Sequence, residues 1–287
     1  MKHEFDYSTI VDKTADTLIR ASTACHPDQA EAYRRAISYE VVPGAAWVME
    51  TLCENAKAAK KQRSPVCDDT GVPHIIIEVG AGRSIDGSLF DAVREGVAAG
   101  LRNLPGRPMA VQGDDLSRLD QSDGLDTNPD AVITAPFLVL PVEGNVLRLH
   151  ILMQGGGPEL RAKTYRVFHK HSIPVIIDEI VDWAIDAADA IGCTPCTLAI
   201  GIGRSHFEAS SLMLQAMIYG KYSEQSELEK EITNRANESG IGPLGMKGAH
   251  TVLATFMKVG PQRASGARIV SMRPCCCVEP RIASVDL

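Results

Sequence analysis

Three short segments of the sequence carry residue types that could do chemistry. CDDTG starts at Cys67, CTPC starts at Cys193, and CCC covers 275–277. A thiolate is both a nucleophile and a metal ligand, and the neighbouring acids Asp68 and Asp69 can move protons. Eight cysteines in a chain without a secretory signal favour metal binding, because reducing conditions argue against a disulfide framework.

The surroundings of each cysteine indicate which thiols face a ligand. Cys67 is followed by a turn sequence rather than by apolar residues, so we expect an exposed thiolate there. Cys193 lies on a loop, whereas strand alternation directs Cys196 into the core. Three consecutive thiols cannot all face the same way, so either Cys276 or Cys277 would be the third ligand.

Three single, well-separated thiolates are unusual for structural zinc, which is commonly held by paired cysteines. The sequence contains only one CxxC pair, at 193–196, and lacks the second pair that would complete a four-ligand zinc site. The pattern instead suits a [4Fe–4S] cluster with three protein thiolates, which leaves one iron without a protein sulfur. Such an iron is a Lewis acid that can hold a hydroxyl or carboxylate group.

The elements that must position these residues are helical at first and mixed afterwards. Apolar periodicity predicts three helices within the first 60 residues. Later segments alternate between strands and helices, with strands expected at 74–79, 131–140, 145–153, 196–202, 250–259 and 267–272, and helices near 86–102, 174–191, 205–219 and 223–238. We therefore expect an α/β (mixed α+β) fold, in which a helical section (1–62) packs on a mixed-sheet catalytic body (63–287) within one domain.

Glycine-rich segments recur where strands end or helices begin: MQGGGPEL, IGIGRSHFE and GIGPLGMKG. Glycine lets backbone N–H groups approach a ligand closely. Ser205 and Glu208 have the spacing of a capping box, which predicts a helix N-terminus just after the GIG segment. GIGRSH lacks the last glycine of a dinucleotide-binding loop, so nucleotide binding is weakly supported.

Composition excludes several classes of function. The net charge of −7 and pI near 5.6 argue against binding to a nucleic-acid backbone. Apolar stretches are too short or too interrupted by acids to cross a membrane. The N-terminal segment has neither a signal-peptide apolar core nor transit-peptide character, which predicts a cytoplasmic protein.

Taken in order along the chain, these motifs resemble those of the class I iron–sulfur hydro-lyases, the fumarate hydratase and tartrate dehydratase group. CDDTG resembles the family's CQDTG, GLRNLPGRP its LR segment, and QGGGPEL its KGGGSEN. CTPCTLAIGIGRSHFE and CCVEPR are similar to its CPP–glycine–Glu and C-x-A-x-R-R elements. The resemblance covers nearly the whole chain.

The resemblance implies roles for individual residues. The ligands of a [4Fe–4S] cluster would be Cys67, Cys193 and Cys276, with Cys277 as the alternative third ligand. Asp69 would be the catalytic acid/base.

The substrate would be bound by Asp68, by Arg102 as the carboxylate-binding arginine, and by the backbone of Gly156. Lys247 and His250 align with a glycine/lysine/histidine region of the family in an ambiguous register. They are only candidates.

The sequence also departs from the family pattern. Asp68 stands where the family has glutamine, and an ionised carboxylate can only accept hydrogen bonds. We therefore expect Asp68 to be protonated or paired with a cation, or the substrate to differ near that contact. Arg204, Pro158 and Pro280 also replace family residues. These departures affect the prediction of the substrate more than the prediction of the fold.

The resulting expectation is a hydro-lyase that reversibly hydrates or dehydrates a small dicarboxylate of the fumarate/malate or tartrate/oxaloacetate type. The chain would be the α subunit of an oligomeric enzyme whose β subunit is a separate chain. The alternative is a non-catalytic, cysteine-rich protein that binds metal or senses oxidants. No nucleic-acid or membrane partner is expected.

Overall fold

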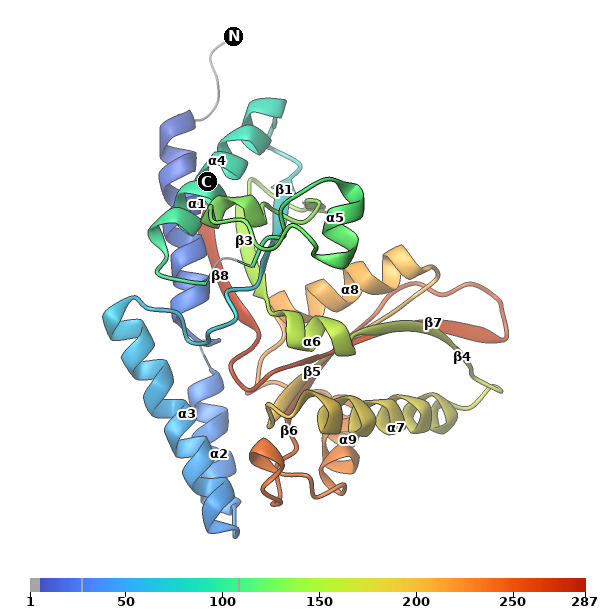
Figure 1. Cartoon of the computed structure of the whole chain (residues 1–287). Helices are drawn as coiled ribbons and strands as arrows, with labels where there is room; N and C mark the ends of the chain where they lie inside the picture. The colour runs from blue at the N-terminus through green and yellow to red at the C-terminus, as the bar shows by residue number, and fades with distance from the viewer. Residues whose placement is uncertain (1–5, 27, 108) are drawn as a thin grey trace. The chain divides into compact units, whose positions relative to one another are not determined.

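The computed structural model describes residues 6–26, 28–107 and 109–287, and it contains both helices and strands (Figure 1). Packing divides the chain into two compact units, each drawn from separate stretches of sequence. Unit 1 comprises Met1–Ala24, Ala56–Gly156 and Arg281–Leu287, and unit 2 comprises Cys25–Asn55 and Gly157–Pro280.

Unit 1 is built on a four-stranded mixed sheet of order β2-β1-β3-β8. Its strands are β1 (Val72–Gly80), β2 (Leu138–Val142), β3 (Leu147–Gln154) and β8 (Arg281–Asp286). The pairs β1–β3 and β3–β8 are antiparallel, whereas β1 and β2 run parallel. The central strands β1 and β3 are almost entirely buried, as expected where a sheet is covered by helices.

Two helices, α1 (Tyr7–Thr23) and α4 (Gly87–Asn103), pack against each other and form the core of unit 1 with the apolar strands. Their contact is close because Gly96 has no side chain: a Cβ atom there would lie 2.6 Å from the Val11 carbonyl oxygen. The side chains of Asp6 and Asp86 cap the two N-termini. A short helix, α5 (Asp115–Asp120), and a 3₁₀ turn, η1 (Pro129–Val132), follow α4.

Unit 2 holds the second four-stranded sheet, of order β4-β7-β5-β6. Its strands are β4 (Lys163–Phe168), β5 (Cys196–Gly203), β6 (Val252–Val259) and β7 (Ala267–Cys275). β5 lies between a parallel neighbour, β6, and an antiparallel one, β7, and all of its residues are buried.

Helices cover both faces of this sheet. Figure 1 shows α7 (Ile173–Ile191) and α9 (Glu227–Asn237) on one face and α8 (His206–Tyr219) on the other. The remaining helical elements of unit 2 are α2 (Gln29–Tyr39), most of α3 (Pro43–Gln62), α6 (Gly156–Arg161) and the 3₁₀ turn η2 (Pro243–Gly245). Each face of the sheet thus forms its own apolar cluster.

The α/β fold class is confirmed, and most predicted elements lie within a few residues of their expected positions. The expected strand at 131–140 is largely wrong, because η1 and an irregular segment occupy its first half and β2 begins at Leu138. Four further elements, α5, α6, β4 and β8, were not predicted from the sequence. All four are six residues long, too short for a clear periodic pattern.

The three N-terminal helices do not share one packing environment. α1 belongs to unit 1 and α2 to unit 2, while α3 crosses the division between Asn55 and Ala56. The domain boundary at 62/63 stays a prediction, since the compact units are defined by packing alone. No helix within the described ranges is long and apolar enough to cross a membrane.

Candidate functional site

The carboxylate of Asp69 is held by unit 1 itself. The backbone N–H of Gly156 donates to Asp69 Oδ2 at 2.7 Å, and Arg281 Nη1 donates to the Asp69 carbonyl oxygen at 2.7 Å. The other carboxylate oxygen, Oδ1, accepts no hydrogen bond from the described residues. Asp69 is half-buried, so it has a fixed position and one oxygen available to a ligand.

Gly71 explains why the CDDTG loop can sit so close to its neighbours. Its φ is +80°, a left-handed conformation that disfavours side chains, and a Cβ atom would lie 2.7 Å from both the Gln154 carbonyl oxygen and Arg281 Nη2. The loop therefore contacts the end of β3 and the start of β8 directly. The glycine in CDDTG serves this close packing.

Asp68 is paired with a cation, one of the alternatives that its sequence suggested. Arg107 Nη2 lies 3.2 Å from Asp68 Oδ2, and both side chains are mostly exposed. On its other side, Asp68 Oδ1 lies 3.5 Å from Cys67 Sγ. Cys67 is half-buried rather than fully exposed.

Arg102 has a different partner from the CDDTG loop. It lies in the last turn of α4 and forms an ion pair with Asp130 of η1. Its proposed contact with a substrate carboxylate therefore stays a prediction, and it would require Arg102 to exchange or share Asp130.

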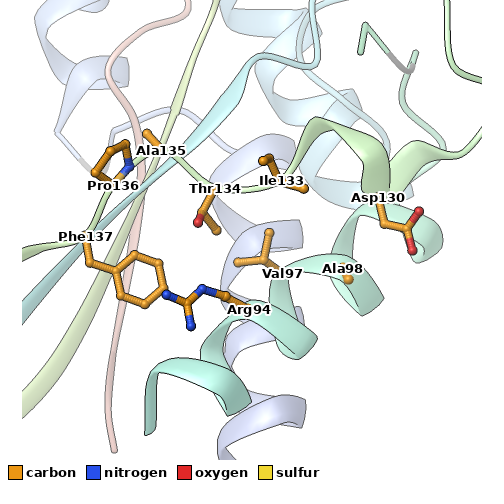
Figure 2. Close-up of a pocket in the computed structure, with 9 residues that line it drawn as sticks. All are labelled: Arg94, Val97, Ala98, Asp130, Ile133, Thr134, Ala135, Pro136 and Phe137. Atoms are coloured by element: carbon orange, nitrogen blue, oxygen red, sulfur yellow. The ribbon is translucent and has the colours of Figure 1, made fainter. Parts of the chain in front are cut away.

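Asp130 also lines a cavity of about 340 Å³ between α4 and the segment that follows η1 (Figure 2). Arg94 extends along this cavity toward Phe137, with its guanidinium carbon 5.2 Å from the ring centre. The cavity contains none of the predicted site residues. Its polar lining side chains are those of Arg94, Asp130 and Thr134.

In unit 2, two of the predicted cysteine segments are adjacent. The backbone N–H of Cys277 donates to the carbonyl oxygen of Cys193 at 2.9 Å. The Cys277 carbonyl accepts hydrogen bonds from the Tyr33 hydroxyl at 2.6 Å and from Gln29 Nε2 at 3.4 Å. Residues far apart in the sequence thus fix the CCC segment beside the CTPC loop.

Burial separates candidate ligands from core cysteines. Cys193 is exposed, as predicted, whereas Cys196 and Cys275 have no exposed surface. Burial raises the pKa of Cys196 to about 12 and raises the pKa of Cys275 strongly, which keeps both as thiols. Cys276 and Cys277 are 9% and 8% exposed, so burial does not distinguish between them.

The GIGPLGMKGAH segment lies against the CTPC loop. The Thr194 hydroxyl donates to the Gly242 carbonyl at 2.6 Å, and the Leu244 N–H donates to the Thr194 carbonyl at 3.1 Å. Farther along, the Glu40 carboxylate accepts the Ala249 N–H at 2.9 Å and lies 3.2 Å from His250 Nδ1. His250 therefore has a structural partner, whereas Lys247 is exposed.

The glycines of the GIG segment serve packing rather than ligand approach. A Cβ atom on Gly201 would lie 2.0 Å from the Ala209 carbonyl oxygen, so α8 rests directly on β5 at this point. Ser205 caps α8 as predicted, but the reciprocal half of the capping box is absent. Glu208 instead accepts the Arg204 N–H at 2.6 Å and pairs with the Arg204 guanidinium.

Sequence reasoning missed three residues that organise the site. Arg107 and Arg281 lie within the segments GLRNLPGRP and CCVEPR, but the motifs assign no role to either residue, and Arg281 is 1% exposed. Glu40 gave no signal at all, because its partners are about 210 residues away. The one available signal was the similarity of CCVEPR, which ends at Arg281, to a family motif.

The cysteine thiols are the candidate donors for a metal cluster. Among the residues whose placement is described, no group of three or more His, Cys, Asp or Glu side chains is arranged to hold a metal ion. The donor chemistry nevertheless fits a three-thiolate cluster. Cys67 is half-buried on a loop, Cys193 is exposed, and burial removes Cys196 and Cys275 from the candidates.

The sequence of the chain is similar to those of several known proteins. A protein of Methanocaldococcus jannaschii, named provisionally as an L(+)-tartrate dehydratase α subunit, is 26% identical over 223 residues, covering 74% of each chain. The L(+)-tartrate dehydratase α subunit of Escherichia coli is 22% identical, over 76% of this chain and 71% of its own.

A protein of Geobacillus stearothermophilus, named provisionally as a class I fumarate hydratase, is 25% identical over 75% of this chain, but the match spans only 42% of that protein. The sequence profile of the family fumarate hydratase (fumerase) matches residues 11–285, nearly the whole chain. The chain therefore belongs to the fumarate hydratase (fumerase) family of hydro-lyases.

Proposed function

We propose that this protein is an iron–sulfur-dependent hydro-lyase that reversibly adds water to, or removes it from, a small dicarboxylate. The observation that carries the proposal is the position of Asp69, two residues from Cys67: its carboxylate accepts a hydrogen bond from the Gly156 N–H, and its backbone carbonyl accepts one from Arg281. A base with one oxygen held and one available suits proton transfer at a substrate carbon. Membership of the fumarate hydratase family supports the same reaction class.

In this proposal Cys67, Cys193 and Cys276 hold a [4Fe–4S] cluster, with Cys277 as the alternative third ligand. When bound, the cluster supplies Lewis acidity for a hydroxyl leaving group. Asp69 takes the C–H proton at Oδ1 during dehydration and returns it during hydration. One proton and one hydroxide leave per turnover, which balances as one water.

The remaining predicted residues bind the substrate carboxylates. Charge-assisted hydrogen bonds from Arg102 would orient one carboxylate, and the backbone around Gly156 would contact the other end of the site. General acid–base catalysis by Asp69 would contribute about 10²–10⁴-fold to the rate.

The proposal includes a separate β subunit. This part of the proposal is supported by the lengths of the matches. The chain matches more than two thirds of the length of two proteins named as α subunits, but less than half of the length of a protein named as a fumarate hydratase. It also includes a cytoplasmic location, since all eight cysteines are free of disulfides.

The test is anaerobic purification of the chain, alone and co-expressed with the product of the neighbouring gene, followed by cluster reconstitution. Iron and acid-labile sulfide are measured, and activity is assayed with fumarate, malate, tartrate, oxaloacetate and mesaconate. We expect broad visible absorbance that bleaches in air together with hydro-lyase activity. A colourless protein with stoichiometric zinc and no turnover would disprove the proposal.

A further inference from the structure

The pair formed by Asp68 and Arg107 lies directly beside the proposed catalytic loop. Asp68 Oδ1 is 3.5 Å from Cys67 Sγ, and Oδ2 is 3.2 Å from Arg107 Nη2. The Asp68 side chain is 79% exposed and that of Arg107 is 57% exposed, so both are open to a ligand.

The backbone next to Arg107 is tightly packed against the CDDTG loop, and this packing places Arg107 close to Asp68. A Cβ atom on Gly106 would lie 2.6 Å from the Thr70 Oγ1 atom. Thr70 is 4% exposed, and its hydroxyl has no hydrogen-bond partner among the described residues. Glycine at 106 therefore allows Arg107 to follow the CDDTG loop at close range.

The chemistry of this pair restricts what a substrate can offer it. An ionised carboxylate only accepts hydrogen bonds, and it has about four acceptor positions. Arg107 occupies one of them, and Cys67 Sγ, 3.5 Å from Oδ1, faces another. A substrate carboxylate also only accepts hydrogen bonds, so it cannot donate one to the Asp68 carboxylate. Within a hydroxy diacid the hydroxyl groups are the only donors.

A monohydroxy diacid has a single hydroxyl, and that group leaves in the reaction. A dihydroxy diacid retains a second hydroxyl on the neighbouring carbon, which can donate to Asp68. Arg107 offsets the charge of Asp68 and so lets the anionic substrate approach.

From this geometry we propose that Asp68 and Arg107 determine specificity for a dihydroxy diacid over a monohydroxy diacid. Asp68 accepts a hydrogen bond from the hydroxyl that is retained, and Arg107 is a positioning residue that keeps Asp68 in place. The inference rests on the proposed hydro-lyase function and narrows its substrate class.

The test compares kcat/KM for tartrate stereoisomers with kcat/KM for malate, using the reconstituted enzyme with its β chain if one is required. The unmodified enzyme should favour one tartrate isomer. Asp68→Gln should reduce the tartrate-to-malate ratio by about 10–100-fold, because it replaces the charged acceptor with an amide that can donate to a carboxylate. Asp68→Asn should shift the ratio in the same direction.

Arg107→Gln should raise KM for both substrates more than it lowers kcat, since it removes charge compensation. Asp115→Asn is the matched control: this exposed aspartate of unit 1 pairs with Arg118 and lies outside the proposed site, so the ratio should not change. Circular dichroism and iron content check that each variant is folded and loaded.

The outcomes separate the two proposals. An active enzyme whose substrate ratio is unchanged in both Asp68 variants overturns the specificity inference and leaves the hydro-lyase proposal intact. A loaded enzyme that converts no hydroxy diacid overturns the proposed function, and this inference with it.

Discussion

The backbone N–H of Cys277 donates a hydrogen bond to the carbonyl oxygen of Cys193 at 2.9 Å. This bond joins two loops that are more than 80 residues apart in the sequence, and both contain predicted ligands. Cys196 is only three residues from Cys193, yet it is fully buried in the core. Cys193 and Cys196 are therefore a matched pair of positions for testing which cysteines bind the proposed cluster.

Cys193→Ala should abolish stable cluster binding, because it removes one of three proposed thiolates. Cys196→Ala should keep the cluster and lower the free energy of unfolding by about 1 kcal/mol through loss of packing. Iron and sulfide content after anaerobic reconstitution measures the difference. Retention of full iron by Cys193→Ala would refute its role as a ligand.

Asp69→Asn should reduce kcat by about 10²–10⁴-fold, because the amide cannot accept the substrate proton. The amide oxygen can still accept the Gly156 N–H, so the loop and the cluster absorbance should remain. Steady-state kinetics at matched iron content is the measurement. Asp91→Asn, at an exposed position on α4, serves as the control, and near-normal turnover of Asp69→Asn would show that another group moves the proton.

Gly71→Ala should lower the free energy of unfolding by at least about 1–2 kcal/mol, because an alanine is strained at a φ of +80° and would collide with Gln154. Displacement of the loop should also reduce activity by moving Asp69. Gly87→Ala is the control, since a Cβ atom there meets nothing within 4 Å. Equal stability of the two variants in urea titrations would contradict this account of Gly71.

Acid should destabilise the protein partly through His26. Burial lowers the pKa of His26, although Asp28, whose Oδ1 lies 2.5 Å from His26 Nδ1, opposes this effect. The unfolded chain therefore binds a proton below about pH 6.5 that the folded chain does not bind, and stability falls as the pH decreases through that range. The slope from one group is at most about 1.4 kcal/mol per pH unit.

The measurement is the free energy of unfolding of the unmodified protein and of His26→Gln between pH 7.5 and 5. We expect a shallower slope in the variant. His74→Gln is the control, because His74 is only half-buried and its imidazole lies 3.2 Å from the nearby Val72 carbonyl. Identical slopes for all three proteins would rule out His26 as a source of the pH dependence.

The fold class, the long helices and strands, and the family can be predicted from the sequence alone. Long helices and buried strands repeat their apolar pattern over enough residues to be recognised, and strand alternation correctly separated Cys193 from Cys196. The order of the motifs along the chain was sufficient to identify the family, which the sequence profile confirmed.

Contacts between residues that are distant in the sequence become visible only in the three-dimensional structure. Arg107 pairs with Asp68 39 positions away in sequence, Arg281 contacts Asp69 across 212 positions, and Glu40 contacts His250 across 210. Such contacts depend on how strands and loops from separate segments pack together, which no local pattern encodes. The same holds for Gly201. Its lack of a side chain allows α8 to pack directly on β5, a contact that is seen only in the folded structure.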